Sequence, residues 1–175
     1  MGDRRLHVLA IVAAAFVLGA CVQSQTLLLK GANVLGDDFE LHLYQEFVAG
    51  KAVAPKSGVY HWNGDRYERV SGNVAEGIKF VRIESLGHDD LLVEGTDDKD
   101  YAYFLAHKLA EATYRFVPVE EKNLGATEQK RLCVKQDRDT CTIATRAALD
   151  TLVRASLRKA SSYTMVAVVA VPAAK

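Results

Sequence analysis

The sequence predicts an α+β domain with an antiparallel meander of short strands, one main amphipathic helix near the carboxyl end, and a final buried strand. Three observations lead to this fold class. Between residues 58 and 119, β-branched and aromatic runs alternate with short turn-forming stretches. Between residues 145 and 158, the apolar residues change to helical spacing. Residues 163–171 then form a valine-rich apolar run that ends at a proline.

The predicted strands of the meander are separated by turn residues. They are residues 59–62, 66–70, 78–84, 91–95, 101–109 and 113–119. Asn63 and Gly64, between the first two strands, are the strongest short signal for a type I′ turn, which needs positive φ at both positions. Because the connections are short, neighbouring strands are expected to be antiparallel, since parallel neighbours need long crossover connections.

Two acidic stretches, residues 88–90 and 96–100, are interpreted as solvated turns. Aspartate side chains hydrogen-bond to their own backbone in such turns. A metal site is disfavoured because neither stretch has the spaced acids, glycine and terminal glutamate of a calcium loop. We therefore expect no metal here.

The main helix is expected to begin after Thr145, whose hydroxyl can cap it. Its apolar stripe lies at helical spacing and should face the sheet. The stripe consists of Ala148, Leu149, Leu152, Val153 and Leu157. The run at 163–171 is expected to be a strand that is buried on both faces and central in the sheet.

The stretch before residue 57 fits more than one structure. Residues 39–48 alternate like a strand at Phe39, Leu41 and Leu43, but Phe39, Leu43 and Phe47 also follow helical spacing. We favour a short helix, followed by a linker at residues 49–57. The expected organisation is a signal peptide at 1–20, an anchored segment and linker at 21–56, and a single α+β domain at 57–172.

The amino terminus has the pattern of an export signal. Arg4 and Arg5 precede residues 8–20, which carry no charge. This run is shorter than the roughly 20 apolar residues that a membrane-spanning helix needs, and its length is typical of a secretory signal peptide. We therefore expect export.

The end of the run, Leu18-Gly19-Ala20-Cys21, resembles the lipobox of bacterial lipoprotein signal peptides. The resemblance covers residues 1–21 only. It implies that the Cys21 sulfur receives a diacylglycerol, that the chain is cut before Cys21, and that the new amino group is acylated.

Val22 follows the cysteine, which in enterobacterial lipoproteins goes with transfer to the outer membrane. The expected location is the cell envelope, lipid-anchored and facing the periplasm, at the outer rather than the inner membrane. The alternative is an ordinary secretory signal that leaves Cys21 as a free thiol.

With Cys21 assigned to the anchor, Cys133 and Cys141 remain, and an oxidising compartment predicts a structural disulfide between them. We expect a hairpin of strands 131–136 and 140–144 that places the two cysteines directly opposite each other. Closing so short a loop stabilises the fold by roughly 2.5 kcal/mol. A zinc pair lacks two further nearby ligands, and a catalytic thiol lacks a nearby base.

Composition and motifs narrow the function only by exclusion. The chain has 22 basic and 22 acidic residues, so it lacks the basic footprint of a nucleic-acid partner. It contains no G-x-S-x-G, H-E-x-x-H or glycine-rich nucleotide loop, and we expect no cofactor. Catalytic residues scattered along the sequence, including His42, His61 and His107, are the alternative.

The aromatic residues are the one candidate binding feature. A recognition face on the sheet would use large side chains with a polar end, whereas aromatic residues also pack simply across strands. The candidate face consists of Tyr60, Trp62, Tyr67, Tyr101 and Tyr103. The function expected is a non-enzymatic binding or assembly module at a membrane surface, with an envelope protein as its partner. The alternative is a hydrolase directed at cell wall or lipid.

Overall fold

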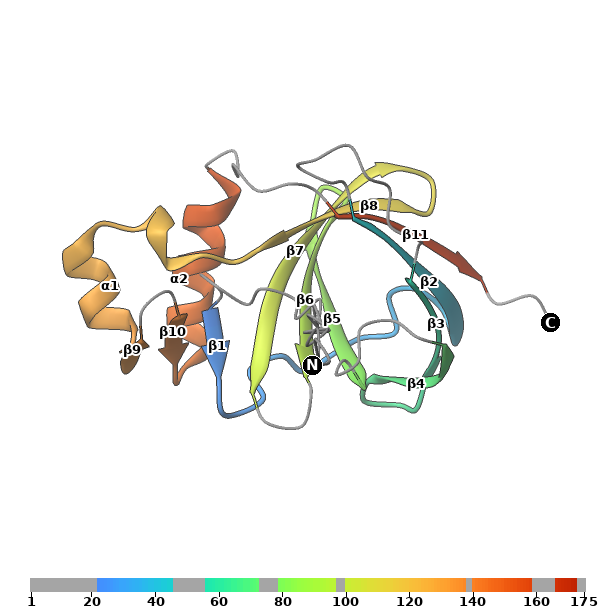
Figure 1. Cartoon of the computed structure of the whole chain (residues 1–175), viewed down its shortest axis with the longest axis horizontal. Helices are drawn as coiled ribbons and strands as arrows, with labels where there is room; N and C mark the ends of the chain where they lie inside the picture. Colours follow the sequence, from blue (N-terminus) through green and yellow to red (C-terminus); the bar gives the residue numbers. More distant parts are fainter. Residues whose placement is uncertain are drawn as a thin grey trace, which may run out of the picture.

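The computed structural model describes residues 22–45, 56–72, 79–96, 100–137, 140–158 and 166–172. Our predictions for the leader, Cys21, most of the linker and residues 97–99 lie outside these ranges. The described residues form one mixed sheet of 11 strands together with two α-helices (Figure 1). The α+β class is therefore confirmed.

Eight of the strands close into a ring. Each strand pairs antiparallel with the next along the chain, β11 pairs with both β8 and β2, and β6 pairs with β7. Closure leaves these strands without a free edge. The ring consists of β2 (Asp38–Gln45), β3 (Lys56–Trp62), β4 (Tyr67–Gly72), β5 (Phe80–Gly87), β6 (Asp90–Thr96), β7 (Tyr101–Ala110), β8 (Thr113–Pro118) and β11 (Val166–Pro172).

The remaining elements lie together beside the ring, on the left in Figure 1. The short strand β1 pairs antiparallel with β7 and parallel with β10, which in turn pairs with β9. The parallel pair corrects the expectation of a purely antiparallel sheet. It forms because β1 and β10 are far apart in sequence, so no short turn restricts their direction. These elements are β1 (Val22–Ser24), the 3-10 helix η1 (Glu121–Asn123), α1 (Ala126–Leu132), β9 (Lys135–Asp137), β10 (Thr140–Ile143) and α2 (Arg146–Leu157).

Helix α2 is capped by Thr145, whose hydroxyl accepts a hydrogen bond from the Ala148 backbone nitrogen at 3.2 Å. Four residues of the apolar stripe are buried, namely Ala148, Leu149, Leu152 and Val153. Leu157 was also expected in the stripe but is 48% exposed. It is the last residue of the helix.

The region before residue 57 corrects two predictions. Residues 38–45 form strand β2 and not a helix, because β3 and β11 pair with β2 along both of its sides. Such tertiary pairing overrides an ambiguous local pattern. Since β1 and β2 belong to the same sheet as the later strands, the folded domain extends N-terminal of residue 57.

The turn chemistry also differs from the expectation. Trp62 pairs with Tyr67, so the β3–β4 connection has four residues. Within it, Asn63 Oδ1 accepts hydrogen bonds from the backbone nitrogens of Asp65 and Arg66. A two-residue turn with positive φ at both positions occurs instead at His88 (52°) and Asp89 (67°), between β5 and β6. The interpretation of residues 88–90 as a turn is confirmed.

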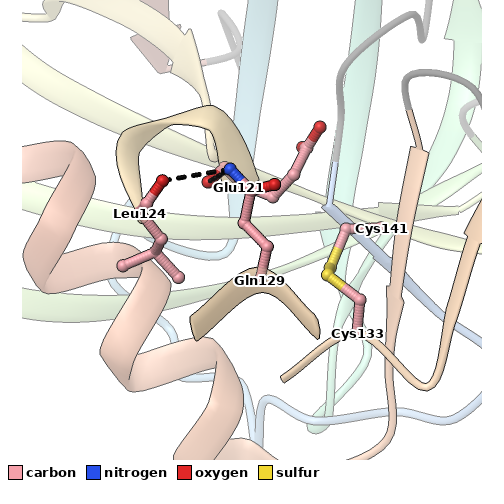
Figure 2. Close-up of a disulfide and its surroundings, with 5 residues drawn as sticks. All are labelled: Glu121, Leu124, Gln129, Cys133 and Cys141. Atoms are coloured by element: carbon pink, nitrogen blue, oxygen red, sulfur yellow. Dashed lines mark hydrogen bonds between the residues drawn. A yellow bond between two sulfur atoms is a disulfide. The ribbon is translucent and has the colours of Figure 1, made fainter. Parts of the chain in front are cut away.

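Cys133 and Cys141 form the predicted disulfide, with their Cα atoms 5.2 Å apart (Figure 2). The predicted hairpin is wrong in detail. Residues 131 and 132 end helix α1, and Cys141 pairs with Gln136 and not with Cys133. Helix α1 is held in place because the Gln129 side-chain nitrogen donates to the carbonyl oxygens of Glu121 and Leu124, at 3.0 Å each.

Two separate cores lie on the opposite faces of strands β5 to β7. The outer core joins this wall to α2, β1 and β10, and includes Leu92, Tyr103 and Leu105. The inner core lies inside the ring and includes Leu91 and Val93. Successive residues of β6 alternate between the two cores because side chains alternate across a strand.

A candidate ligand-binding interior

The inside of the ring is lined by aromatic side chains. They are Phe39, Tyr60, Trp62, Tyr67, Phe104, Tyr114 and Phe116. Phe39 stacks on Tyr60 with ring centroids 5.2 Å apart and meets Tyr67 edge to face at 4.9 Å. These contacts fix the aromatic groups on β2, β3 and β4.

The inward residues differ in how completely they are buried. Tyr60, Tyr67, Ile83 and Val93 on β3 to β6 are buried, as are Phe39 on β2 and Ala106 on β7. The apolar residues that are only partly buried are Leu41 on β2, Trp62 on β3, Phe104 on β7, and Tyr114 and Phe116 on β8. Part of the apolar surface of these side chains is therefore accessible to solvent.

Tyr60 is a buried polar group with no partner inside the ring. Its side chain is 0% exposed, and its hydroxyl makes no hydrogen bond within the part of the chain that the structure describes. Burial raises the pKa of Tyr60 to about 12, while the nearby positive charge of Arg69 acts in the opposite direction. Buried hydroxyls nearly always have a partner, and leaving one without costs about 1–3 kcal/mol.

Arg69 lies directly opposite Tyr60 in the register of β3 and β4. Directly paired residues share a face of the sheet, so Arg69 belongs to the inner face, as does Tyr67 two residues before it. The next pair on this face of the sheet is Gly58 with Gly72. That pair adds no side chain to the wall beside Tyr60 and Arg69.

Gly72 is required at its position. Its φ is +101°, and a Cβ there would lie 2.3 Å from the Ser57 carbonyl oxygen. Since only glycine adopts this backbone at such close range, the wall stays free of a side chain at this level.

Residues 27–37 form a strap that runs from the outer core to the inner core. Leu29 packs in the outer core, whereas Val34 and Leu35 pack against the inner one. The Ala32 nitrogen donates to the Ile83 carbonyl at 2.9 Å, and the Leu35 nitrogen donates to the Tyr67 hydroxyl at 2.9 Å. The strap therefore binds to the wall where β4 and β5 share only two register pairs.

A buried polar network fastens the first part of the strap. Glu94 Oε1 accepts from the Leu28 backbone nitrogen at 3.0 Å and from the Tyr103 hydroxyl at 2.9 Å, and that hydroxyl also contacts Ser24 Oγ at 2.6 Å. Arg82, 6% exposed, lies 4.0 Å from Glu94 and forms an ion pair with Asp65. The network is covered by the strap.

The titration of Glu94 follows from this position. Burial raises the pKa of its carboxyl group, and the hydrogen bonds from Leu28 and Tyr103 and the charge of Arg82 oppose the rise only in part. Glu94 Oε2 and the Nε and Nη1 atoms of Arg82 make no hydrogen bond within the described chain, so the network is satisfied only in part. Because it joins the strap to the sheet, we assign this network a positioning role.

The structure divides the five predicted aromatic residues between the two cores. Tyr60, Trp62 and Tyr67 gather inside the ring, whereas Tyr101 and Tyr103 belong to the outer core. The five therefore do not share one face.

Sequence reasoning did not single out four further residues of the interior. These are Phe39, Arg69, Phe104 and Phe116. The alternation of apolar and polar residues along β2 and β8 was the available signal. It shows which residues share a face of the sheet, but that face becomes the inside of a ring only if the sheet closes.

The predicted alternative site residues do not converge. His42, His61 and His107 each contact a different acid, namely Glu40 at 3.3 Å, Asp38 at 2.7 Å, and Asp90. Within the described ranges, no group of three or more histidine, cysteine or acidic residues is arranged to hold a metal.

Comparison of the chain with protein-family models, curated proteins and solved structures finds no match. Among the residues that the structure describes, no helix has the length and apolar character needed to cross a membrane.

Proposed function

We propose that this protein is an exported lipoprotein that binds an apolar small molecule inside its closed sheet, at a membrane surface and without catalysing a reaction. The observation that carries the binding proposal is that the same ring interior holds partly buried apolar residues on β2, β7 and β8 and a buried Tyr60 hydroxyl without a partner. Ligand sites are typically concave and mostly apolar, with a few polar groups that fix orientation. The inside of an eight-stranded ring is about wide enough for one small ligand.

The proposed location is supported by the leader and by the disulfide. The charge-free run ending at Cys21 predicts export and acylation. The bond between Cys133 and Cys141 is of a kind that persists in oxidising compartments such as the periplasm. Two or more acyl chains give stable attachment, so a ligand could pass between the anchored domain and the membrane or an envelope partner.

A binding role is favoured over a cell-wall or lipid hydrolase. A hydrolase needs acids or histidines that converge on an accessible site. The three histidines discussed above lie apart, each beside its own acid, and Glu94 is buried beneath the strap.

Binding inside the ring can be tested with the neutral apolar dye N-phenylnaphthylamine. We expect the full chain to bind it and Phe116→Lys to lose the binding, because a charge on the inner wall opposes an apolar ligand. Val117→Lys is the matched control, since residue 117 points to the opposite face of β8. Circular dichroism checks that both variants fold.

Equal dye binding by Phe116→Lys and the wild type would overturn the proposed site. Should Phe116→Lys not fold, displacement of the dye from the wild-type chain by dodecane decides the matter. We expect displacement at a single saturable site, and its absence contradicts the proposal.

Location is tested separately by intact-mass analysis of protein extracted from membranes. We expect the wild type to begin at Cys21 with added acyl chains, and Cys21→Ala to retain its leader and carry none. Reduction of the Cys133–Cys141 bond to two thiols should add the mass of two hydrogen atoms. A wild-type chain that still begins at Met1 contradicts the lipoprotein proposal.

A further inference from the structure

Arg69 and Tyr60 lie on neighbouring strands and are paired directly, next to the level of Gly58 and Gly72 on the inner face. Both side chains carry hydrogen-bond donors. Tyr60 stacks on Phe39, which fixes the position of its ring. Two such donors on an apolar inner wall form a site for an acceptor group.

We propose that the ligand is an amphiphile with an anionic oxygen head group, which Arg69 and the Tyr60 hydroxyl bind, while its apolar chain lies along the partly buried wall of β2, β7 and β8. This inference rests on the function proposed above and specifies its ligand class.

The chemistry of the two side chains favours an anion over other head groups. A guanidinium group is permanently charged and offers several N–H donors that match a carboxylate or phosphate. The Tyr60 phenol stays protonated at neutral pH, since its pKa is raised to about 12, and therefore donates. A bound oxygen would supply the partner that the Tyr60 hydroxyl lacks within the described chain.

The apolar wall determines the other end of the ligand. Leu41 lies opposite Gly58 in the register of β2 and β3, next to the Tyr60–Arg69 level. Phe116 and Tyr114 continue the wall on β8 and remain partly buried. An alkyl chain that covered them would remove apolar surface from water, which is worth about 25 cal/mol per Å².

The test compares three probes with the same alkyl tail: dodecanoate, dodecanol and dodecyltrimethylammonium. The full chain is reconstituted on phosphatidylcholine vesicles, and binding is followed through the fluorescence of Trp62, the single tryptophan of the chain, on the inner wall. We expect dodecanoate to bind at least about tenfold more tightly than the cation, with dodecanol between them; a tenfold ratio corresponds to about 1.4 kcal/mol.

Two variants locate the head group. Arg69→Met should remove the preference for dodecanoate while retaining dodecanol binding, and Tyr60→Phe should reduce the preference severalfold. Arg66→Met is the control, since Arg66 lies in the β3–β4 connection and pairs with Glu68 at 2.8 Å. If Arg69→Met does not fold, the Tyr60→Phe result decides.

The outcomes separate this inference from the proposed function. Equal binding of all three probes, or an unchanged preference in the variants that fold, overturns the anionic head group but leaves an apolar binding site. Binding of none of the probes, together with no binding of the dye, overturns both.

Discussion

Tyr60 and Tyr103 lie on the same closed sheet and are both completely buried, yet their hydroxyl groups have opposite surroundings. The Tyr103 hydroxyl contacts Ser24 and Glu94, whereas the Tyr60 hydroxyl has no hydrogen-bond partner within the described chain. Burial raises the pKa of both phenols. The difference therefore lies in their partners and not in their depth.

The polar groups of the two cores differ less sharply than these two tyrosines. Beside the outer core, the Tyr103 hydroxyl joins Ser24 to Glu94, and Glu94 binds the strap, although Glu94 Oε2 and two Arg82 nitrogens make no hydrogen bond within the described chain. In the inner core, several aromatic groups are only partly buried and the Tyr60 hydroxyl has no partner within the described chain. A partnered buried group contributes to stability, whereas a buried group without a partner costs stability.

The largest loss of stability is expected from removing the charge of Arg82 beside the outer core. Arg82→Met removes the cation beside buried Glu94, and leaving such a charge uncompensated costs about 3–5 kcal/mol. Arg66→Met makes the same chemical change in an ion pair whose side chains are 33% and 45% exposed, and it should cost less than about 1 kcal/mol. Urea unfolding of both variants measures the difference, and equal losses contradict a structural role for the network.

The disulfide gives the next largest effect. Replacing Cys133 and Cys141 together by serine should lower the free energy of unfolding by roughly 2.5 kcal/mol, because the closed loop no longer restricts the unfolded chain. Dye binding inside the ring should be retained, since the bond lies in the outer core. Loss of dye binding in a folded double variant would show that the two cores are not independent.

A smaller effect is expected on the way in which the stability of the fold depends on pH. The pKa of Glu94 is raised in the folded chain above its ordinary value of 4.5, so the folded state keeps its proton longer than the unfolded state. Between 4.5 and the folded pKa, this group therefore lowers stability as the pH rises. Glu94→Gln should match the wild type below pH 4.5 and become relatively more stable above it. Unfolding curves across this range test the sign, and the opposite trend contradicts it.

The sequence predicted the meander well because that information is local. Turns and alternation at residues 88–90 and along β5 to β8 reflect short-range chemistry, and the two cysteines are close in sequence. The helical assignment of residues 39–48 was wrong because pairing with β11, more than 100 positions away in sequence, decides the structure of β2.

The candidate site was predicted only in part for the same reason. Tyr60, Trp62 and Tyr67 are adjacent strand residues and were found together. Tyr101 and Tyr103 were wrongly assigned to the same face as these three residues. Alternation along a strand shows which of its residues share a face, but it does not show which face becomes the inside of the ring. The place of Arg69 beside Tyr60 depends on a bulge between β3 and β4 that the sequence does not indicate.

The most direct test of the account compares Tyr60→Phe with Tyr103→Phe, which delete one oxygen each from equally buried rings. Tyr60→Phe should leave the free energy of unfolding unchanged or raise it by up to about 1–3 kcal/mol, because it removes a buried donor that has no partner within the described chain, and it should weaken the dodecanoate preference. Tyr103→Phe should lose about 2 kcal/mol of stability and keep the preference, because Glu94 and Ser24 lose a partner. If the two variants behave alike in both measurements, the division between a structural outer core and a ligand-binding inner core is wrong.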